Sequence, residues 1–66
     1  MKLDIRATLL AIAESQLTTK EILAKAKITP RTWFRARKGE TLRPQTAWRI
    51  AQALGVSLEK LMAKEQ

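Results

Sequence analysis

Apolar residues recur along the chain every three or four positions, the spacing at which side chains share one face of an α-helix. No segment sustains the alternation of apolar and polar residues that marks a half-buried strand, and the chain has a single valine. The pattern therefore predicts an all-α protein. Capping residues, prolines and glycines divide the apolar periods into five short helices, which we expect to form a compact bundle.

The first predicted helix runs from about Asp4 to Glu14. Asp4 is a good N-cap, because its carboxylate can accept hydrogen bonds from the free backbone N–H groups of the first turn. Helical spacing puts four apolar residues on one face, which we expect to contact the core: Ile5, Leu9, Ile12 and Ala13.

The second predicted helix begins after Thr18 and runs to about Ala26. Thr18 followed three residues later by Glu21 is the capping-box pattern, in which each side chain binds the backbone N–H of the other residue. Ile22, Leu23 and Ala26 are predicted to face the core.

The third predicted helix runs from about Pro30 to Lys38. Thr29 suits its N-cap, and Pro30 suits the first helical position, where a missing N–H costs nothing. Gly39 ends the helix, because glycine readily adopts the left-handed conformation that follows many helices. Only residues 27–29 separate this helix from the second, and so short a connection predicts a steep crossing.

The fourth predicted helix begins near Pro44 and runs to Leu54, with Gly55 as its stop. Its apolar stripe consists of Ala47, Ile50, Ala51 and Leu54. Ser57 is then predicted to cap a short fifth helix. The apolar residues of this last helix, which could close the core or form the seam of a homodimer, are Leu58, Leu61 and Met62.

Positive charge is concentrated in the middle of the chain. The stretch from Lys20 to Arg49 holds nine basic and two acidic residues, so it accounts for the whole net charge of +7, and the two ends balance. A basic middle between neutral ends indicates a surface that binds a polyanion. An uneven solvated surface is the simpler alternative.

The residue types that are missing argue against an enzyme. The chain has no cysteine and no histidine, and its six carboxylates are scattered, so we expect no metal, no cofactor, no small-molecule ligand and no catalytic site. No apolar run is long enough for a signal peptide or a membrane span. We therefore expect one domain over residues 1–66, located in the cytoplasm.

Four stretches of the chain resemble one family. They are residues 17–24 (LTTKEILA), 28–33 (ITPRTW), 41–44 (TLRP) and, most specifically, 50–61 (IAQALGVSLEKL). From Leu17 to Met62 the sequence is similar to the Cro/CI-type helix-turn-helix proteins of phages, the XRE family. The resemblance implies a lambda-repressor-like fold whose third helix reads DNA. Lys27 stands where the family usually has glycine, and Trp33 replaces an aliphatic residue, which requires a larger pocket.

The third helix is predicted to have one basic face. At 100° per residue, Arg31, Arg35 and Lys38 share a side, and Trp33 and Ala36 lie opposite. An arginine can bind both O6 and N7 of guanine in the major groove. Arg31 and Arg35 are the residues that we expect to read bases, since both also match reading positions of the family. The hypothesis would fail if these two arginines were folded against neighbouring carboxylates or covered by the protein's own helices.

The residues next to these arginines have more than one possible role. The Thr32 hydroxyl could reach a base or a phosphate, and Phe34 could contact a thymine methyl group or a sugar, or cover an edge of the core. Thr19 matches a phosphate contact of the family, at a helix N-terminus that also offers N–H groups. Further candidate phosphate contacts, each of which could equally be solvated surface, are Lys20, Lys38 and Arg43.

The two tryptophans, Trp33 and Trp48, could stack on the bases of single strands. Trp33 lies on the inward side of its helix, and Trp48 flanks an apolar stripe, so we predict that both belong to the core.

Together these features predict a sequence-specific, double-stranded DNA-binding regulator. The resemblance implies a Cro-like repressor that occupies a pseudo-palindromic operator as a homodimer, at least when it is on DNA. The alternatives are the antitoxin of a toxin–antitoxin pair, a protein-interaction adaptor on the same fold and an RNA-binding protein without sequence preference.

Overall fold

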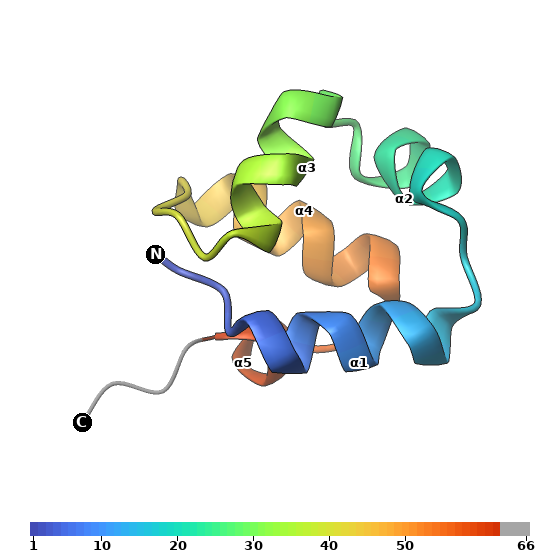
Figure 1. Cartoon of the computed structure of the whole chain (residues 1–66), viewed down its shortest axis with the longest axis horizontal. Coiled ribbons are helices and arrows are strands. Elements are labelled where there is room, and N and C mark those ends of the chain that lie inside the picture. Colours follow the sequence, from blue (N-terminus) through green and yellow to red (C-terminus); the bar gives the residue numbers. More distant parts are fainter. Residues whose placement is uncertain (63–66) are drawn as a thin grey trace.

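Five α-helices form in the computed structural model, which describes residues 1–62 of the chain (Figure 1). The described residues form no strand, and one isolated β-bridge pairs Leu3 with Met62. None of the helices in this part of the chain has the length and apolar character needed to cross a membrane. The predicted all-α fold is confirmed, and the helices are α1 (Ile5–Ser15), α2 (Thr19–Ala26), α3 (Pro30–Arg37), α4 (Pro44–Leu54) and α5 (Leu58–Leu61).

The starts of the first two helices are fixed by the predicted caps. Asp4 Oδ1 accepts hydrogen bonds from two backbone N–H groups of the first turn of α1, at 2.9 and 3.3 Å. At α2 the capping box is complete: the Thr18 N–H donates to Glu21 Oε1 at 3.0 Å, and the Glu21 N–H donates to Thr18 Oγ1 at 3.2 Å. Ser57 differs, because it stands at the N-cap of α5 but its side chain makes no capping hydrogen bond.

The capping box should make the stability of the protein depend on pH. Hydrogen bonds from Thr18, first from its backbone and then from its side chain, hold the pKa of Glu21 below its usual value. A carboxyl group whose pKa is lower in the folded state stabilises the fold at pH values above the unfolded-state pKa, and this contribution is lost as the pH falls through the folded-state pKa.

The capping box also contributes to stability at neutral pH. In urea denaturation at neutral pH, Thr18→Ala should lower the free energy of unfolding by about 1 kcal/mol.

The matched control for the pH dependence is Glu21→Gln, which keeps an oxygen acceptor but does not titrate. The free energy of unfolding of the native protein should fall more steeply in acid than that of this variant. Parallel pH profiles for the two proteins would show that the capping box does not respond to pH.

The core is built around α4, which contacts α2, α5 and α1. All four residues of its predicted stripe are buried, and Ile50 has no exposed surface, as is also true of Ile22 in α2 and Leu61 in α5. Ala36 of α3 is also completely buried. Alanines at such positions let helix backbones approach closely, so a chain of this size can close its core with few large side chains.

The apolar face predicted for α1 is wrong in most of its members. The side chains of Ile5 and Leu9 are 48% and 47% exposed, and Ala13 is exposed as well. Only Ile12 contacts the core, and it is partly buried. The predicted apolar face of α1 therefore lies mostly on the surface of the protein.

Thr8 and Ala11 form the side of α1 that is buried instead. The Thr8 hydroxyl donates a hydrogen bond to the Asp4 carbonyl at 2.7 Å, so its polar atom is satisfied within the helix and can be buried without another partner. Leu3, which is 2% exposed, enters the core just before the helix. The prediction treated threonine as a polar residue that faces solvent, and for this reason it placed the wrong face of α1 against the core.

Residues 1–4 connect α5 with the loop between α3 and α4. The Asp4 N–H donates to the Leu61 carbonyl at 2.7 Å, and the Leu42 N–H donates to the Met1 carbonyl at 2.6 Å. The Met1 nitrogen donates in turn to the Leu42 carbonyl at 3.2 Å. Figure 1 shows this segment running beside the loop that follows α3.

Candidate nucleic-acid interface

The turn between α2 and α3 is three residues long and fixed by its backbone. Lys27 adopts the left-handed conformation (φ 56°, ψ 47°), and its N–H donates to the Leu23 carbonyl. The Ile28 N–H donates to the same carbonyl at 3.3 Å, and the Ile28 side chain contacts the core. Thr29 then caps α3 by accepting from the Thr32 N–H at 3.2 Å. A lysine in this conformation costs roughly 1 kcal/mol that a glycine would avoid.

Helix α3 has one buried and one exposed side, as predicted. Trp33 is 4% exposed and Ala36 is completely buried. The other side presents three cations to solvent, and we call these three residues the basic face: Arg31, Arg35 and Lys38. Because the inner side holds the helix against the core, the direction of the basic face is set by the fold.

One of the two predicted reading residues contacts a carboxylate. Arg35 Nε lies 3.1 Å from Glu40 Oε1, and the two side chains are 54% and 44% exposed. Arg35 is therefore engaged by a carboxylate, whereas Arg31 forms no ion pair within residues 1–62, so the two arginines are not both folded against carboxylates. An exposed pair of this kind stabilises by about 0–1 kcal/mol. The contact uses only Nε, so the terminal N–H groups of the guanidinium are left to form a fork with a guanine.

The two neighbours of the arginines differ in their surroundings. Thr32 is partly buried, and its Oγ1 accepts a hydrogen bond from the Thr29 hydroxyl at 3.0 Å, which directs it toward the N-cap. Phe34 is 59% exposed, so the alternative in which it covers an edge of the core is wrong. Lys38 Nζ lies 4.5 Å from the centre of the Phe34 ring, and this cation–π contact joins the aromatic ring to the basic face.

A polar hollow of about 280 Å³ lies between α3 and the start of α4. Arg35 and Arg43 both line it, so the structure brings one predicted reading residue together with one predicted phosphate contact. Thr41 and Thr46 line it too, and neither was predicted from the sequence as a site residue. The sequence feature that could have indicated them is the pair of threonines that flank Arg43. We call this site the α3–α4 hollow.

No side chain of residues 1–62 caps the start of α4. Arg43 occupies the N-cap position, and Pro44 at the first helical position has no N–H. Among the described residues, no hydrogen-bond acceptor is found for the N–H groups of Gln45 and Thr46. Free N–H groups at a helix start, beside two guanidinium groups, favour an anion such as a phosphate.

The other predicted phosphate contacts are exposed but separate from this hollow. Thr19 and Lys20 lie at the start of α2, and neither lines the α3–α4 hollow. Lys38 is exposed beside the end of α3. Their exposure leaves them accessible to a ligand without specifying one.

The prediction that Trp48 belongs to the core is wrong. It is 53% exposed, because it follows Ala47 by one position and so points about 100° away from the buried stripe of α4. Around it lie three cations in a hollow of about 250 Å³. These cations are Lys25, Lys27 and Arg49.

The residues predicted for a dimer seam contribute mainly to the subunit itself. Leu61 has no exposed surface, so it closes the core and cannot contact a second copy. Leu58 is partly buried against the core, and Met62 is partly buried at the β-bridge to Leu3. Of the two alternatives for this segment, the core role is the one that the burial of Leu61 supports.

Comparisons with known proteins give no relative: no family model, no curated protein and no solved structure matches the chain. The site is therefore defined by its own geometry. It consists of a basic face on a helix that is fixed to the core, with a polar, arginine-lined hollow beside it.

Proposed function

We propose that this chain is a DNA-binding protein of the helix-turn-helix class, in which α3 reads base pairs in the major groove of double-stranded DNA. In particular, we propose a Cro-like repressor that recognises a pseudo-palindromic operator as a homodimer. The observation that carries the proposal is the sidedness of α3, which buries Trp33 and Ala36 and turns three cations to solvent. A single helix fits the major groove of B-DNA, and arginine is the commonest reader of guanine there.

The site divides into residues that specify and residues that position. Arg31 and Arg35 belong to the first group, because both side chains are exposed on the outer side of α3. Arg43 and the free N–H groups at the start of α4 belong to the second, because contacts to phosphate fix the register of a protein on DNA without reading sequence. Arg35 connects the two groups, since it also lines the α3–α4 hollow.

The test is a selection of bound sequences from a library of random double-stranded DNA, at a fixed salt concentration. We expect an enriched motif with two related half-sites that contain G·C pairs and lie about 10 base pairs apart, or a multiple of this distance. The matched control is the double variant Arg31→Ala/Arg35→Ala, which should retain weak binding to DNA of any sequence and enrich no motif.

Other outcomes would contradict the proposal. Binding without enrichment would show a protein that does not read sequence, and stronger binding to unrelated RNA than to the enriched DNA would exclude an operator. No binding to any nucleic acid, together with co-purification of a protein partner, would favour an adaptor or an antitoxin.

A further inference from the structure

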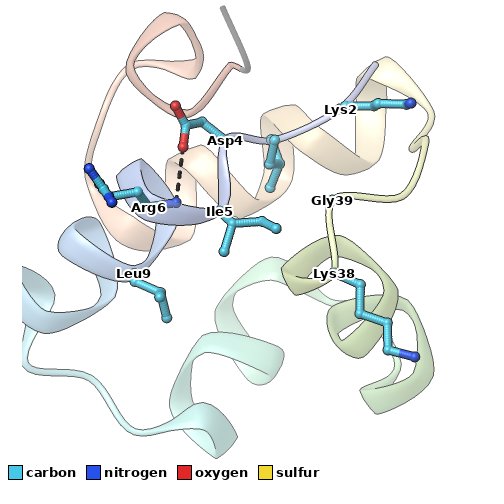
Figure 2. A pocket seen from close by; sticks show the side chains of 8 residues that line it. Lys2, Asp4, Ile5, Arg6, Leu9, Lys38 and Gly39 are labelled. Carbon is cyan, nitrogen blue, oxygen red and sulfur yellow. Dashed lines mark hydrogen bonds between the residues drawn. The ribbon is translucent and has the colours of Figure 1, made fainter.

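An open groove of about 680 Å³ lies between the start of α1 and the end of α3. Figure 2 shows Ile5 and Leu9 projecting into it from successive turns of α1, opposite Lys38 and Gly39. The side chains of Ile5 and Leu9 are about half exposed. We call this site the α1–α3 groove.

The floor of the groove is apolar and closely fitted. A Cβ atom added to Gly39 would lie 3.4 Å from Ile5 Cδ1, so the backbone after α3 rests directly on the Ile5 side chain. Leu9 extends this apolar surface by one helical turn, since it follows Ile5 by four residues. Exposed apolar side chains that gather in one place usually mark a site where another molecule binds.

The rim of the groove is positively charged. Lys2, Arg6 and Lys38 line it, and Asp4 is the one acidic residue in its lining among the residues that the structure describes. The Asp4 carboxylate is already engaged, because its Oδ1 accepts from the backbone N–H of Arg6 and from the next N–H of α1 (Figure 2). An apolar floor with three cations around it is complementary to a ligand that carries both aliphatic groups and carboxylates.

We propose that the α1–α3 groove binds an amphipathic helix of a partner protein. The helix would place aliphatic side chains, one turn apart, against Ile5 and Leu9, and its flanking carboxylates would pair with the three rim cations. A second copy of this chain is a poorer occupant, because a contact through this groove would bring two cationic rims together. The proposal does not depend on DNA binding, and it gives a role to exposed residues of α1 that neither the core nor the basic face uses.

The test uses the full chain and a fluorescein-labelled synthetic helical peptide. The peptide carries leucines at i, i+4 and i+7 and glutamates on the flanking positions, and a scrambled peptide of the same composition is the reference. Fluorescence anisotropy should show saturable binding of the helical peptide and much weaker binding of the scrambled one. Leu9→Glu should weaken binding of the helical peptide by about tenfold or more, because it removes an apolar contact and adds a repelling charge.

The matched control variant is Leu10→Glu. Leu10 lies on the same helix and is 59% exposed, but it does not line the groove, so its replacement should leave the affinity unchanged. Lys2→Glu, at the rim and outside any helix, should weaken binding severalfold and reduce its dependence on salt. Thermal unfolding of each variant, followed by circular dichroism, confirms that the proteins compared are folded.

Three results would overturn the proposal. One is no binding of the helical peptide, or equal affinity for the scrambled one. The second is an equal loss of affinity in Leu9→Glu and Leu10→Glu. The third is self-association of the native protein, in analytical ultracentrifugation, that Leu9→Glu abolishes and Leu10→Glu does not, because a second copy would then occupy the groove.

Discussion

Replacing Trp33 with alanine should lower the free energy of unfolding by about 3–5 kcal/mol. Trp33 is the largest side chain on the inner side of α3 and is 4% exposed, so its removal leaves a cavity between the helix and the core. Small domains have total stabilities toward the lower end of about 5–15 kcal/mol. Urea denaturation followed by circular dichroism should therefore show a protein that is largely unfolded before the transition of the native chain begins.

Two further variants test whether the lost packing of Trp33 causes this loss of stability. Within residues 1–62, nothing accepts a hydrogen bond from the buried indole N–H of Trp33. Trp33→Phe removes this unpaired donor, whose burial costs about 1–3 kcal/mol, so it should lose much less stability than the alanine variant. Trp48→Ala, at a side chain that is 53% exposed, should change stability by no more than about 0.5 kcal/mol. Similar losses in Trp33→Ala and Trp48→Ala would refute the assignment of Trp33 to the core.

The second large effect concerns recognition and depends on the proposed function. On the operator that the library selection defines, Arg31→Ala should weaken binding by about 1–3 kcal/mol, which is about 5- to 150-fold. It should also relax the preference at one base pair, because Arg31 is exposed on the basic face and free of the ion pair that engages Arg35. Fluorescence anisotropy titrations on the operator, on single-base variants and on random DNA measure both effects.

Lys38→Ala is the matched control for this prediction. A lysine that contacts phosphate should weaken binding evenly across sequences and flatten the salt dependence by about one unit. Glu40→Gln releases Arg35 and removes a negative charge near the DNA, so it should strengthen binding to every sequence. If Arg31→Ala weakens binding to the operator and to random DNA by the same factor, Arg31 is not a reading residue.

Local rules predicted the helices of this chain well. Asp4, the Thr18–Glu21 capping box and the Thr29–Pro30 pair each fix a helix start through contacts between residues close in sequence. Such contacts depend little on the rest of the fold, so they can be predicted from a sequence pattern. The face of α1 was mispredicted, because the hydroxyl of Thr8 is satisfied by its own helix and so can be buried.

The candidate site was predictable where it depends on helical periodicity. Trp33 and Ala36 fix the inner side of α3, and the basic face follows from their positions. Glu40 was not anticipated as a partner of Arg35, because it lies beyond the end of the helix, where the angle of 100° per residue no longer applies. The hollow with Thr41 and Thr46 depends on how the loop returns to α4, and this path is set by tertiary contacts.

The hydrogen bonds between Met1 and Leu42 have a consequence for binding at the start of α4. They hold the loop at the residue directly before Arg43, while α3 and α4 hold its two ends. Much of the conformational entropy of this loop is thus already lost when the chain folds, and an anion that binds beside it need not order it again. The loop should therefore act as a rigid, preorganised edge, with the Leu42 amide exchanging its hydrogen slowly in the free protein.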